Sequence, residues 1–487
     1  MRLLEQYLTT VALAFLALVL GGCGAMRAER AEGPPNIVFV LIDDMGFGDL
    51  GVTGARPALT PRIDRLAAQG TLFTEFHVNS PICSASRAAL LTGRDPQRSG
   101  ITSYLDARAV NRRKAQRDWL PLEAPSIARG FKTAGYATGH FGKWHLGGGR
   151  DVEDAPPPTS YGFDESLTSF EGLGDRLLTK GEALSEQSAE LGRGAVTWLP
   201  KHQLTAAYVD AALGFVERHR DRPFFVQLWL TDVHDPWHPS ADQLRATEGA
   251  GRYEEERRML AVLRETDREI GRLLDRLDAL GLADDTLVVL TSDNGPTAWP
   301  RYYKDGGEAP GSTGGRRGRK WSLYEGGIRL PMIVRWPGRV PAGRVDRASL
   351  MLGTDLLPTL ARIGGWAAPV GDGIDMGAAW RGAGPAPAPA RFWDYGSFGD
   401  PKAHILPGLL RDRSPPLAMR EGRWKLLASP DGSRVELYDL QADPEESRNV
   451  ASGQAALVRG MLPRLLRWRA GLGCPAGRQN CFAGEKR

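Results

Sequence analysis

Cysteine, long apolar runs and a surplus of one charge sign are all scarce in this chain of 487 residues. The 4 cysteines exclude a small scaffold held by disulfides, because a chain this long buries enough apolar surface to fold without them. Lys and Arg number 62 against 58 Asp and Glu, and a net charge of only +4 gives no support to nucleic-acid binding. The apolar run 11–20 is too short to span a bilayer, which argues against a polytopic membrane protein. With 59 Gly and 34 Pro, the chain also stays below the range typical of disordered proteins.

The N-terminus has the order of an export signal. Arg2 precedes the apolar run, and the sequence LGGC that ends at Cys23 resembles the lipobox of bacterial lipoproteins. This resemblance implies that residues 1–22 form a signal peptide, that Cys23 is acylated after its removal, and that residues 23–35 are a tether. Ordinary signal cleavage beside an incidental cysteine is the alternative. We expect a protein of the cell envelope or periplasm, for which the lipid is the sole membrane anchor.

The remaining cysteines have different expected roles. Cys474 and Cys481 lie in a loop rich in Gly, Pro and Asn, and in an oxidising compartment we expect them to form a disulfide. Cys83 is then left unpaired, and an odd cysteine in an exported protein indicates a special role for that thiol.

Apolar runs alternate with amphipathic stretches along most of the chain. The run NIVFVLI (36–42) is apolar throughout, which is typical of a strand buried on both faces of a parallel sheet. Similar runs and the amphipathic helices between them follow in order: strands at 71–78, 137–144, 223–231, 286–291 and 331–337, and helices at 60–70, 84–91, 126–136, 204–220 and 253–280. The alternation predicts an α/β fold with a mostly parallel central sheet and helices on both faces.

The composition changes at GAGPAPAPA (382–390), which is typical of a linker. Beyond it, the segment 423–440 has a Pro-Asp-Gly turn between two strand-like runs and predicts a hairpin, and a helix is expected over 454–470. We therefore predict a catalytic domain over 36–381, and a linker and smaller α+β domain with a short antiparallel sheet over 382–487.

Acidic side chains follow two of the predicted strands. Asp43 and Asp44 come directly after the first strand, and Asp293 and Asn294 follow the strand at 286–291. The carboxyl ends of parallel strands share one edge, at which such sheets bind ligands. Adjacent carboxylates there repel one another unless a cation joins them, and oxygen ligands suit Ca²⁺ or Mg²⁺. Each pair alone could equally cap the turn or helix that follows it.

Candidate reactive groups lie near the same edge. Cys83 begins the predicted helix 84–91, where a thiol pKa is lowered, although a buried inert thiol or an ordinary cysteine nucleophile are alternatives. Lys143 and His145 lie at the end of one predicted strand, and His234 follows another. Lys320 lies in a basic, Gly-flanked loop that by composition alone could be a solvated turn.

In order and spacing, these elements resemble the formylglycine-dependent sulfatases of the alkaline phosphatase-like superfamily. The resemblance runs from Asn36 through Gly338 and returns in ELYDLQADPEESRNV (436–450), and its most specific parts are CSASRAALLTGR and GRKWSLYEGGIRLP. It implies that a maturation enzyme, formylglycine-generating or anaerobic, oxidises Cys83 to formylglycine. The required pattern is Cys-x-Pro/Ala-x-Arg, and Ala85 stands here where Pro is commoner.

The resemblance also implies the chemistry and the residues that perform it. One hydroxyl of the hydrated aldehyde attacks sulfur and the other loses its proton to expel sulfate, whereas an ordinary Ser or Cys would need a second attack at sulfur. Ca²⁺ polarises the sulfate oxygens. The implied metal ligands are Asp43, Asp44, Cys83, Asp293 and Asn294. The implied catalytic residues are Cys83, Arg87 and Lys143 at the diol, His145 as the acceptor of its proton, Lys320 on the sulfate, and His234 on the sulfate and the leaving oxygen.

We expect sulfated carbohydrates or aryl sulfates as substrates. Trp237, His238 and Tyr302 lie in loops after the site strands, where aromatic rings either stack on a sugar or pack the loops. A phosphodiesterase or phosphonate monoester hydrolase of the same fold is an alternative, but these usually have His where this chain has Asn294. A lipoprotein that binds sulfated glycans without turnover is a second alternative.

Overall fold

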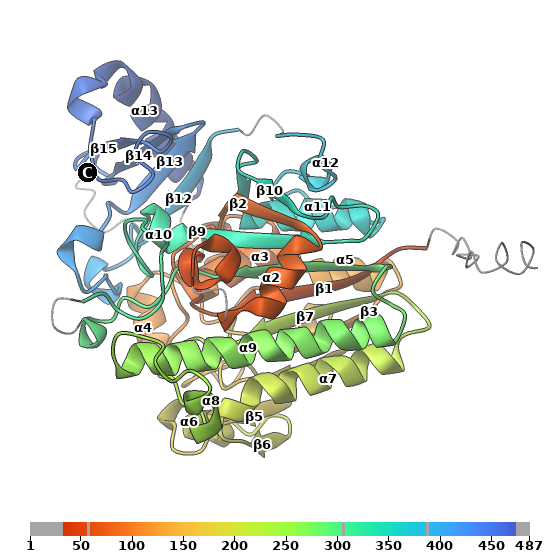
Figure 1. Cartoon of the computed structure of the whole chain (residues 1–487). Coiled ribbons are helices and arrows are strands. Elements are labelled where there is room, and N and C mark those ends of the chain that lie inside the picture. Colours follow the sequence, from red (N-terminus) through yellow and green to blue (C-terminus); the bar gives the residue numbers. More distant parts are fainter. Residues whose placement is uncertain (1–32, 56–58, 304–306, 386–388, 474–487) are drawn as a thin grey trace, which may run out of the picture. The chain divides into compact units, whose positions relative to one another are not determined.

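The computed structural model describes residues 33–55, 59–303, 307–385 and 389–473, and Figure 1 shows the arrangement of their helices and strands. Within these residues an 11-stranded sheet has the order β10-β2-β9-β8-β1-β7-β3-β4-β5-β6, with β11 beside β2. Its strands are β1 (Asn36–Ile42), β2 (Thr71–His77), β3 (Ala137–Gly142), β4 (Glu165–Thr168), β5 (Arg176–Leu178), β6 (Val196–Trp198), β7 (Phe224–Leu230), β8 (Thr286–Ser292), β9 (Arg329–Arg335), β10 (Arg344–Asp346) and β11 (Met351–Leu352).

Helices cover both faces of this sheet, as the alternation predicted. The helices are α2 (Pro61–Ala68), α3 (Cys83–Thr92), α4 (Arg108–Arg113), α5 (Ile127–Thr133), α6 (Ala183–Glu190), α7 (Leu204–Arg218), α8 (Ala241–Arg245), α9 (Glu254–Ala279), α10 (Glu325–Ile328), α11 (Leu356–Ile363), α12 (Gly377–Trp380) and α13 (Ala455–Gly471). Phe39 and its neighbours at every second position of β1 pack with α3, α5 and α11 in one core. Val38 and Val40 point the other way and pack with α2, α7 and α9, and Figure 1 shows α7 and α9 side by side across that face.

Strand register brings the polar strand ends to one edge. Ile42 of β1 pairs with Leu230 of β7 on one side and with Ser292 of β8 on the other, both in parallel. The residues that follow these strands therefore leave the sheet at the same level. β1 is fully buried along its length, as expected for a strand flanked by parallel neighbours and covered on both faces.

Two features of the sheet differ from a simple alternating pattern. β9 runs antiparallel to β2 and β8. The chain leaves β8 at the edge where the polar residues lie, and it enters β9 from that same edge. β4, β5 and β6 were not predicted, since each has three or four residues, too few to display a period. Thr60 is the N-cap residue of α2, directly before its first residue. Its hydroxyl accepts from Gly51 N and donates to the Asp64 side chain instead of capping the helix.

A 4-stranded antiparallel sheet follows among the described residues, with β12 (Arg391–Asp394), β13 (Leu417–Glu421), β14 (Trp424–Ala428) and β15 (Glu436–Asp439) in sequence order. The predicted hairpin is β14 and β15, and the predicted final helix is α13. Ala418, Leu427 and Tyr438 on one face of this sheet belong to the same core as β1, whereas the other face packs on α13. The boundary between residues 381 and 382 therefore stays a prediction.

The predicted signal peptide, Cys23, most of the predicted tether, and Cys474 and Cys481 with their predicted disulfide lie outside the described residues. In the part of the chain that is described, none of the helices is both long enough and apolar enough for a membrane span.

Candidate active site

The acidic residues at the ends of β1 and β8 converge, as the sequence predicted. Asp44 N donates to Asp293 Oδ1 at 3.2 Å, and Asn294 Nδ2 donates to Asp44 Oδ1 at 2.7 Å. Asp43, Asp293 and Asn294 are fully buried, and Asp44 nearly so. Asp44 has φ 59°, a left-handed conformation that costs free energy for residues other than glycine. This conformation turns the chain directly after Asp43.

Cys83 lies beside these carboxylates at the first residue of α3. Its Sγ and carboxylate oxygens of Asp43 and Asp293 all lie within 4.8 Å of one another. Arg87 follows one turn later, on the same side of the helix as Cys83. Arg87 Nη2 contacts Asp293 Oδ2 at 2.7 Å and Asp43 Oδ1 at 3.4 Å, and Nη1 donates to the Lys143 carbonyl at 2.7 Å. Arg87 therefore ties the helix to the ends of β1, β3 and β8.

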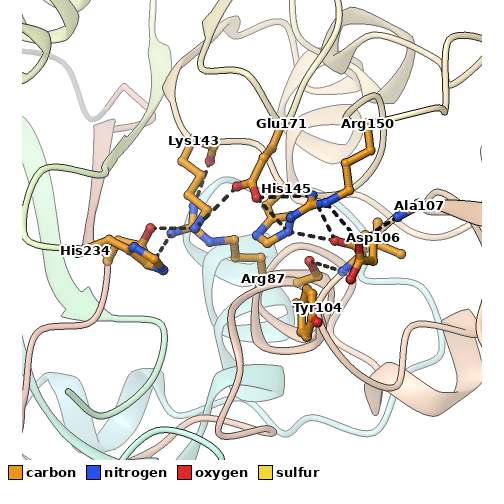
Figure 2. Close-up of polar contacts among 12 residues, drawn as sticks. Arg87, Tyr104, Asp106, Ala107, Lys143, His145, Arg150, Glu171 and His234 are labelled. Atoms are coloured by element: carbon orange, nitrogen blue, oxygen red, sulfur yellow. Dashed lines mark hydrogen bonds and ion pairs between the residues drawn. The ribbon is translucent and has the colours of Figure 1, made fainter. Parts of the chain in front are cut away.

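Lys143 and His145 come from the turn after β3. Gly142 allows that turn: its φ is +117°, and a Cβ there would lie 1.9 Å from the Trp229 carbonyl oxygen. Lys143 Nζ contacts Asp43 Oδ2 at 2.8 Å and Glu171 Oε2 at 3.4 Å. His145 Nε2 contacts Glu171 Oε1 at 3.0 Å, and Figure 2 shows Glu171 between the two side chains.

Lys320 and His234 close the other side of the acidic group. Lys320 Nζ donates to both carboxylate oxygens of Asp44, at 2.6 and 2.7 Å, and lies 3.0 Å from His234 Nε2. His234 Nδ1 lies 2.6 Å from the Asp235 carbonyl, which can only accept, so Nδ1 carries the proton and Nε2 accepts from Lys320. His234 is the most exposed of the predicted catalytic side chains, at 26%.

The donor set fits a hard cation. Asn294 Oδ1 is buried without a hydrogen-bond partner among the described residues, and it adjoins three buried carboxylates. Burial and the nearby charge of Asp43 raise the pKa of Asp293 to about 7. A cation among these oxygens would offset both causes, because it stabilises a buried carboxylate and separates it from the charge of Asp43. Oxygen-rich sets of this kind suit Ca²⁺.

The thiol of Cys83 does not have the lowered pKa that its helix position predicts. Burial raises its pKa to about 11, although Lys143 and Lys320 act in the opposite direction. At neutral pH the unmodified thiol is therefore protonated and a poor nucleophile. An ordinary cysteine nucleophile stays an alternative, which replacement of Cys83 tests.

Among the predicted substrate residues, two are packed into the loops. Trp237 and Tyr302 are buried with ring centroids 5.1 Å apart, and Tyr302 donates to Asp235 Oδ2 at 3.1 Å. Of the two roles that the sequence left open, this geometry supports loop packing. His238 is exposed and borders a small cavity with Lys201 and Glu265, and its contact with substrate stays a prediction.

Sequence reasoning missed Glu171 and the groups beyond it. Glu171 follows β4, a strand too short to show a period, so no predicted strand end points to this residue as one does to Asp43. Arg150 Nη1 lies 3.8 Å from Glu171 Oε1, and Arg150 Nε pairs with Asp106 Oδ1 at 2.9 Å. Figure 2 shows these side chains continuing the line of contacts away from Lys143 toward Tyr104.

Comparison with known proteins gives one consistent answer. The sequence model of the family described as sulfatase matches residues 35–365, and that described as N-sulphoglucosamine sulphohydrolase, C-terminal, matches residues 318–469. N-acetylgalactosamine-6-sulfatase of Canis lupus familiaris is 36% identical over 383 residues, covering 74% of this chain and 68% of the relative. Arylsulfatase A of Homo sapiens is 33% identical over 476 residues, covering 89% and 86%.

Solved structures agree with the sequence relatives. The crystal structure of Ps i-CgsB in complex with k-i-k-neocarrahexaose superposes with a TM-score of 0.72 at 26% identity, covering 91% of this chain and 94% of that one. The fold is thus alkaline phosphatase-like, as the resemblance implied. The matched family covers most of the described residues, including Cys83 and the acidic strand ends, so this chain belongs to the sulfatase family of sulfuric ester hydrolases.

Proposed function

We propose that this protein hydrolyses sulfate monoesters of carbohydrates with a formylglycine made from Cys83 and a bound Ca²⁺ ion. The observation that carries the proposal is the position of Cys83, whose Sγ lies within 4.8 Å of the carboxylate oxygens of Asp43 and Asp293. A nucleophile made at this residue would act directly beside the cation that binds the same oxygens.

Asp43, Asp44, Asp293 and Asn294 would hold the Ca²⁺ ion. When bound, the ion would supply positive charge to the sulfate oxygens, and the hydrated formylglycine would supply two hydroxyls, one to attack sulfur and one whose proton is lost when sulfate leaves. The unpartnered Oδ1 of Asn294 supports this ligand set, since a buried amide oxygen without a donor otherwise costs free energy.

Arg87 and Lys143 would stabilise negative charge at position 83. Burial alone would lower the pKa of Lys143, but Asp43 and Glu171 raise it well above its usual value, so the ammonium stays charged. Preorganised charges of this kind in a dry site contribute roughly 10²–10³ in rate each.

Lys320 and His234 would bind the sulfate group from the opposite side. Lys320 is kept charged because Asp44 outweighs its burial and raises its pKa. Lys320 Nζ lies 3.0 Å from His234 Nε2 and holds the imidazole toward the site, where His234 in its protonated form would give a proton to the leaving oxygen.

A carbohydrate sulfate is the substrate class that the names of one sequence relative and one solved structure support, whereas arylsulfatase A is named for aryl sulfates. One relative is named for the 6-sulfate of N-acetylgalactosamine, and a solved structure of similar fold carries k-i-k-neocarrahexaose. The test is release of free sulfate from a panel of sulfated mono- and oligosaccharides and an aryl sulfate, after co-expression with a maturation enzyme.

Matched phosphonate monoesters and phosphodiesters belong in the same assay. We expect catalytic efficiency to be highest on a sulfated sugar. A preference for the phosphorus esters would contradict the proposal, and binding of sulfated glycans without sulfate release would point to the non-catalytic lipoprotein.

We also propose export and lipidation at Cys23, for which the motif LGGC is the support. In a bacterial host fed radiolabelled palmitate, the wild-type chain should incorporate label into the membrane fraction and Cys23→Ala should not. Equal labelling of both would contradict the anchor.

A further inference from the structure

Glu171 binds His145 through both its backbone and its side chain. The two residues follow β3 and β4, which are neighbouring parallel strands, and His145 N donates to the Glu171 carbonyl at 3.0 Å. His145 also has φ 52°, a left-handed conformation that a non-glycine residue keeps only when its surroundings hold it. A second contact, between His145 Nε2 and Glu171 Oε1 at 3.0 Å, holds the ring beside that carboxylate.

These contacts determine which ring nitrogen carries the proton. His145 Nε2 has two partners, the Glu171 carboxylate and the Leu105 carbonyl at 3.3 Å, and both can only accept. Nε2 must therefore be the donor, and in a neutral ring Nδ1 then holds a free lone pair. Nδ1 is buried and has no hydrogen-bond partner among the described residues.

Glu171 is itself held as a carboxylate. Burial alone would raise its pKa, but His145, Lys143 and Arg150 outweigh it and keep the pKa well below the usual value. Arg150 is in turn held by its ion pair with Asp106. The Glu171 carboxylate therefore lies between two cations, Lys143 and Arg150, as Figure 2 shows.

We propose that Glu171 is a positioning residue of the sulfatase reaction, which fixes the Nε2-protonated form of His145 and leaves Nδ1 as the nitrogen that takes a proton from the group at position 83. The inference rests on the proposed function for the identity of that group. In the step, an O–H bond breaks, its electron pair stays on oxygen and an N–H bond forms at Nδ1. The imidazolium charge that results is balanced by the ionised Glu171.

The tautomer can be measured without activity. In the unmodified protein with ¹⁵N-labelled histidine, nitrogen chemical shifts at pH 7 report which ring nitrogen bears hydrogen, and His145→Gln identifies the signal among 8 histidines. The ring is neutral at that pH, because burial lowers the pKa of His145 to about 4 although Glu171 opposes the shift. We expect the Nε2-protonated form, and a ring protonated at Nδ1 would overturn the inference.

Glu171→Gln tests the role in turnover, in protein that carries formylglycine. We expect kcat to fall about 10- to 100-fold with KM little changed, because an outer hydrogen-bond partner acts through the residue it orients. Glu165→Gln is the matched control, because Glu165 also pairs with a histidine but lies at the start of β4, away from the site. Its partners are His219 at 3.5 Å and Arg218 at 2.6 Å.

Equal kcat for the two variants would overturn the role of Glu171. A melting temperature of Glu171→Gln close to that of the parent would show that a loss of activity does not come from unfolding. Inactivity of the formylglycine-bearing parent on every sulfate ester would instead contradict the proposed function, and the tautomer measurement would stand apart from it.

Discussion

The side chains around Cys83 pair each buried carboxylate with its own cation. Asp43 has Lys143, Asp44 has Lys320, and Asp293 has Arg87, all at 2.6–2.8 Å. Charges removed from water are tolerable only when paired in this way, so removal of one member leaves an uncompensated charge in the site. Changes at these residues should therefore affect chemistry and stability together, whereas a change at Cys83 should affect chemistry alone.

Replacement of Cys83 tests that separation. Cys83→Ala should abolish sulfate release and lower the free energy of unfolding by only about 1 kcal/mol, because a small buried side chain is lost without a charge. Cys83→Ser keeps a hydroxyl but offers no second hydroxyl to expel sulfate, so we expect no turnover from it either. Steady turnover by Cys83→Ser would show that an ordinary nucleophile suffices.

Replacement of Asp293 should remove metal and activity together. Asp293→Ala deletes a predicted Ca²⁺ ligand and both contacts of Arg87 with this carboxylate, so we expect activity to fall at least 10²–10³-fold. Calorimetric titration of the chelator-treated protein should show Ca²⁺ binding in the parent and none in the variant. Asp275→Ala, which removes a surface carboxylate paired with Arg62 and Arg65, is the control. Activity of the parent that survives chelation would argue against the Ca²⁺ ion.

Among the helices and strands, the site depends on where each strand ends and how the chain then turns. The turn after β7 carries Asp232, whose Oδ2 accepts from Thr205 N at 3.0 Å and from Thr205 Oγ1 at 2.6 Å. These bonds tie the start of α7 to the turn that presents His234. Asp232 is buried, and its burial raises its pKa to about 6.

That raised pKa predicts a pH dependence of stability. The folded state keeps the proton of Asp232 up to about pH 6, whereas the unfolded chain loses it near pH 3.8. The contribution of this protonation to the free energy of unfolding is therefore fully present below pH 3.8 and is lost as the pH rises to 6. Asp232→Asn stays neutral and keeps an acceptor for Thr205. Urea unfolding at several pH values should show a fall between pH 4 and 6 that is smaller in the variant than in the parent, by up to about 3 kcal/mol. Parallel curves would contradict the shift.

Long apolar strands and amphipathic helices could be predicted from the sequence because their periods are set by burial. β1, β7 and β8 were located this way, and with them the acidic edge. The direction of β9 relative to its neighbours could not be predicted, since a fully apolar run looks the same in a parallel and an antiparallel strand. Glu171 escaped because its strand is short and half polar. The close packing of Trp237 on Tyr302 depends on two loops distant in sequence, which no local pattern reports.

Over the chain as a whole, the small antiparallel sheet and the large sheet share one core and one buried ion cluster. Lys425 on β14 is fully buried and contacts Glu325 Oε1 at 2.8 Å and Glu446 Oε1 at 3.0 Å. Glu325 lies in α10, directly before β9 of the large sheet. The two sheets should therefore unfold together, although the sequence suggests a domain boundary between them.

Lys425→Met tests this coupling. The substitution leaves two buried carboxylates without their shared cation, which should cost about 3–5 kcal/mol. In both the parent and the variant, we expect intrinsic fluorescence and sulfatase activity to change in one common transition. In the variant, this transition should occur at a lower denaturant concentration. Arg464→Met, which breaks a surface pair with Glu421 next to β14, should change stability little. An early transition that leaves activity intact would show that the small sheet unfolds on its own.

The central claim is that Cys83 becomes the aldehyde that attacks sulfur beside a calcium ion. Its most direct test is mass spectrometry of the peptide that contains residue 83, from protein co-expressed with a maturation enzyme, with sulfate release measured on the same samples. The account predicts that the mass of formylglycine replaces that of cysteine, and that turnover rises in proportion to the converted fraction. Full turnover by protein whose Cys83 remains a thiol would contradict it.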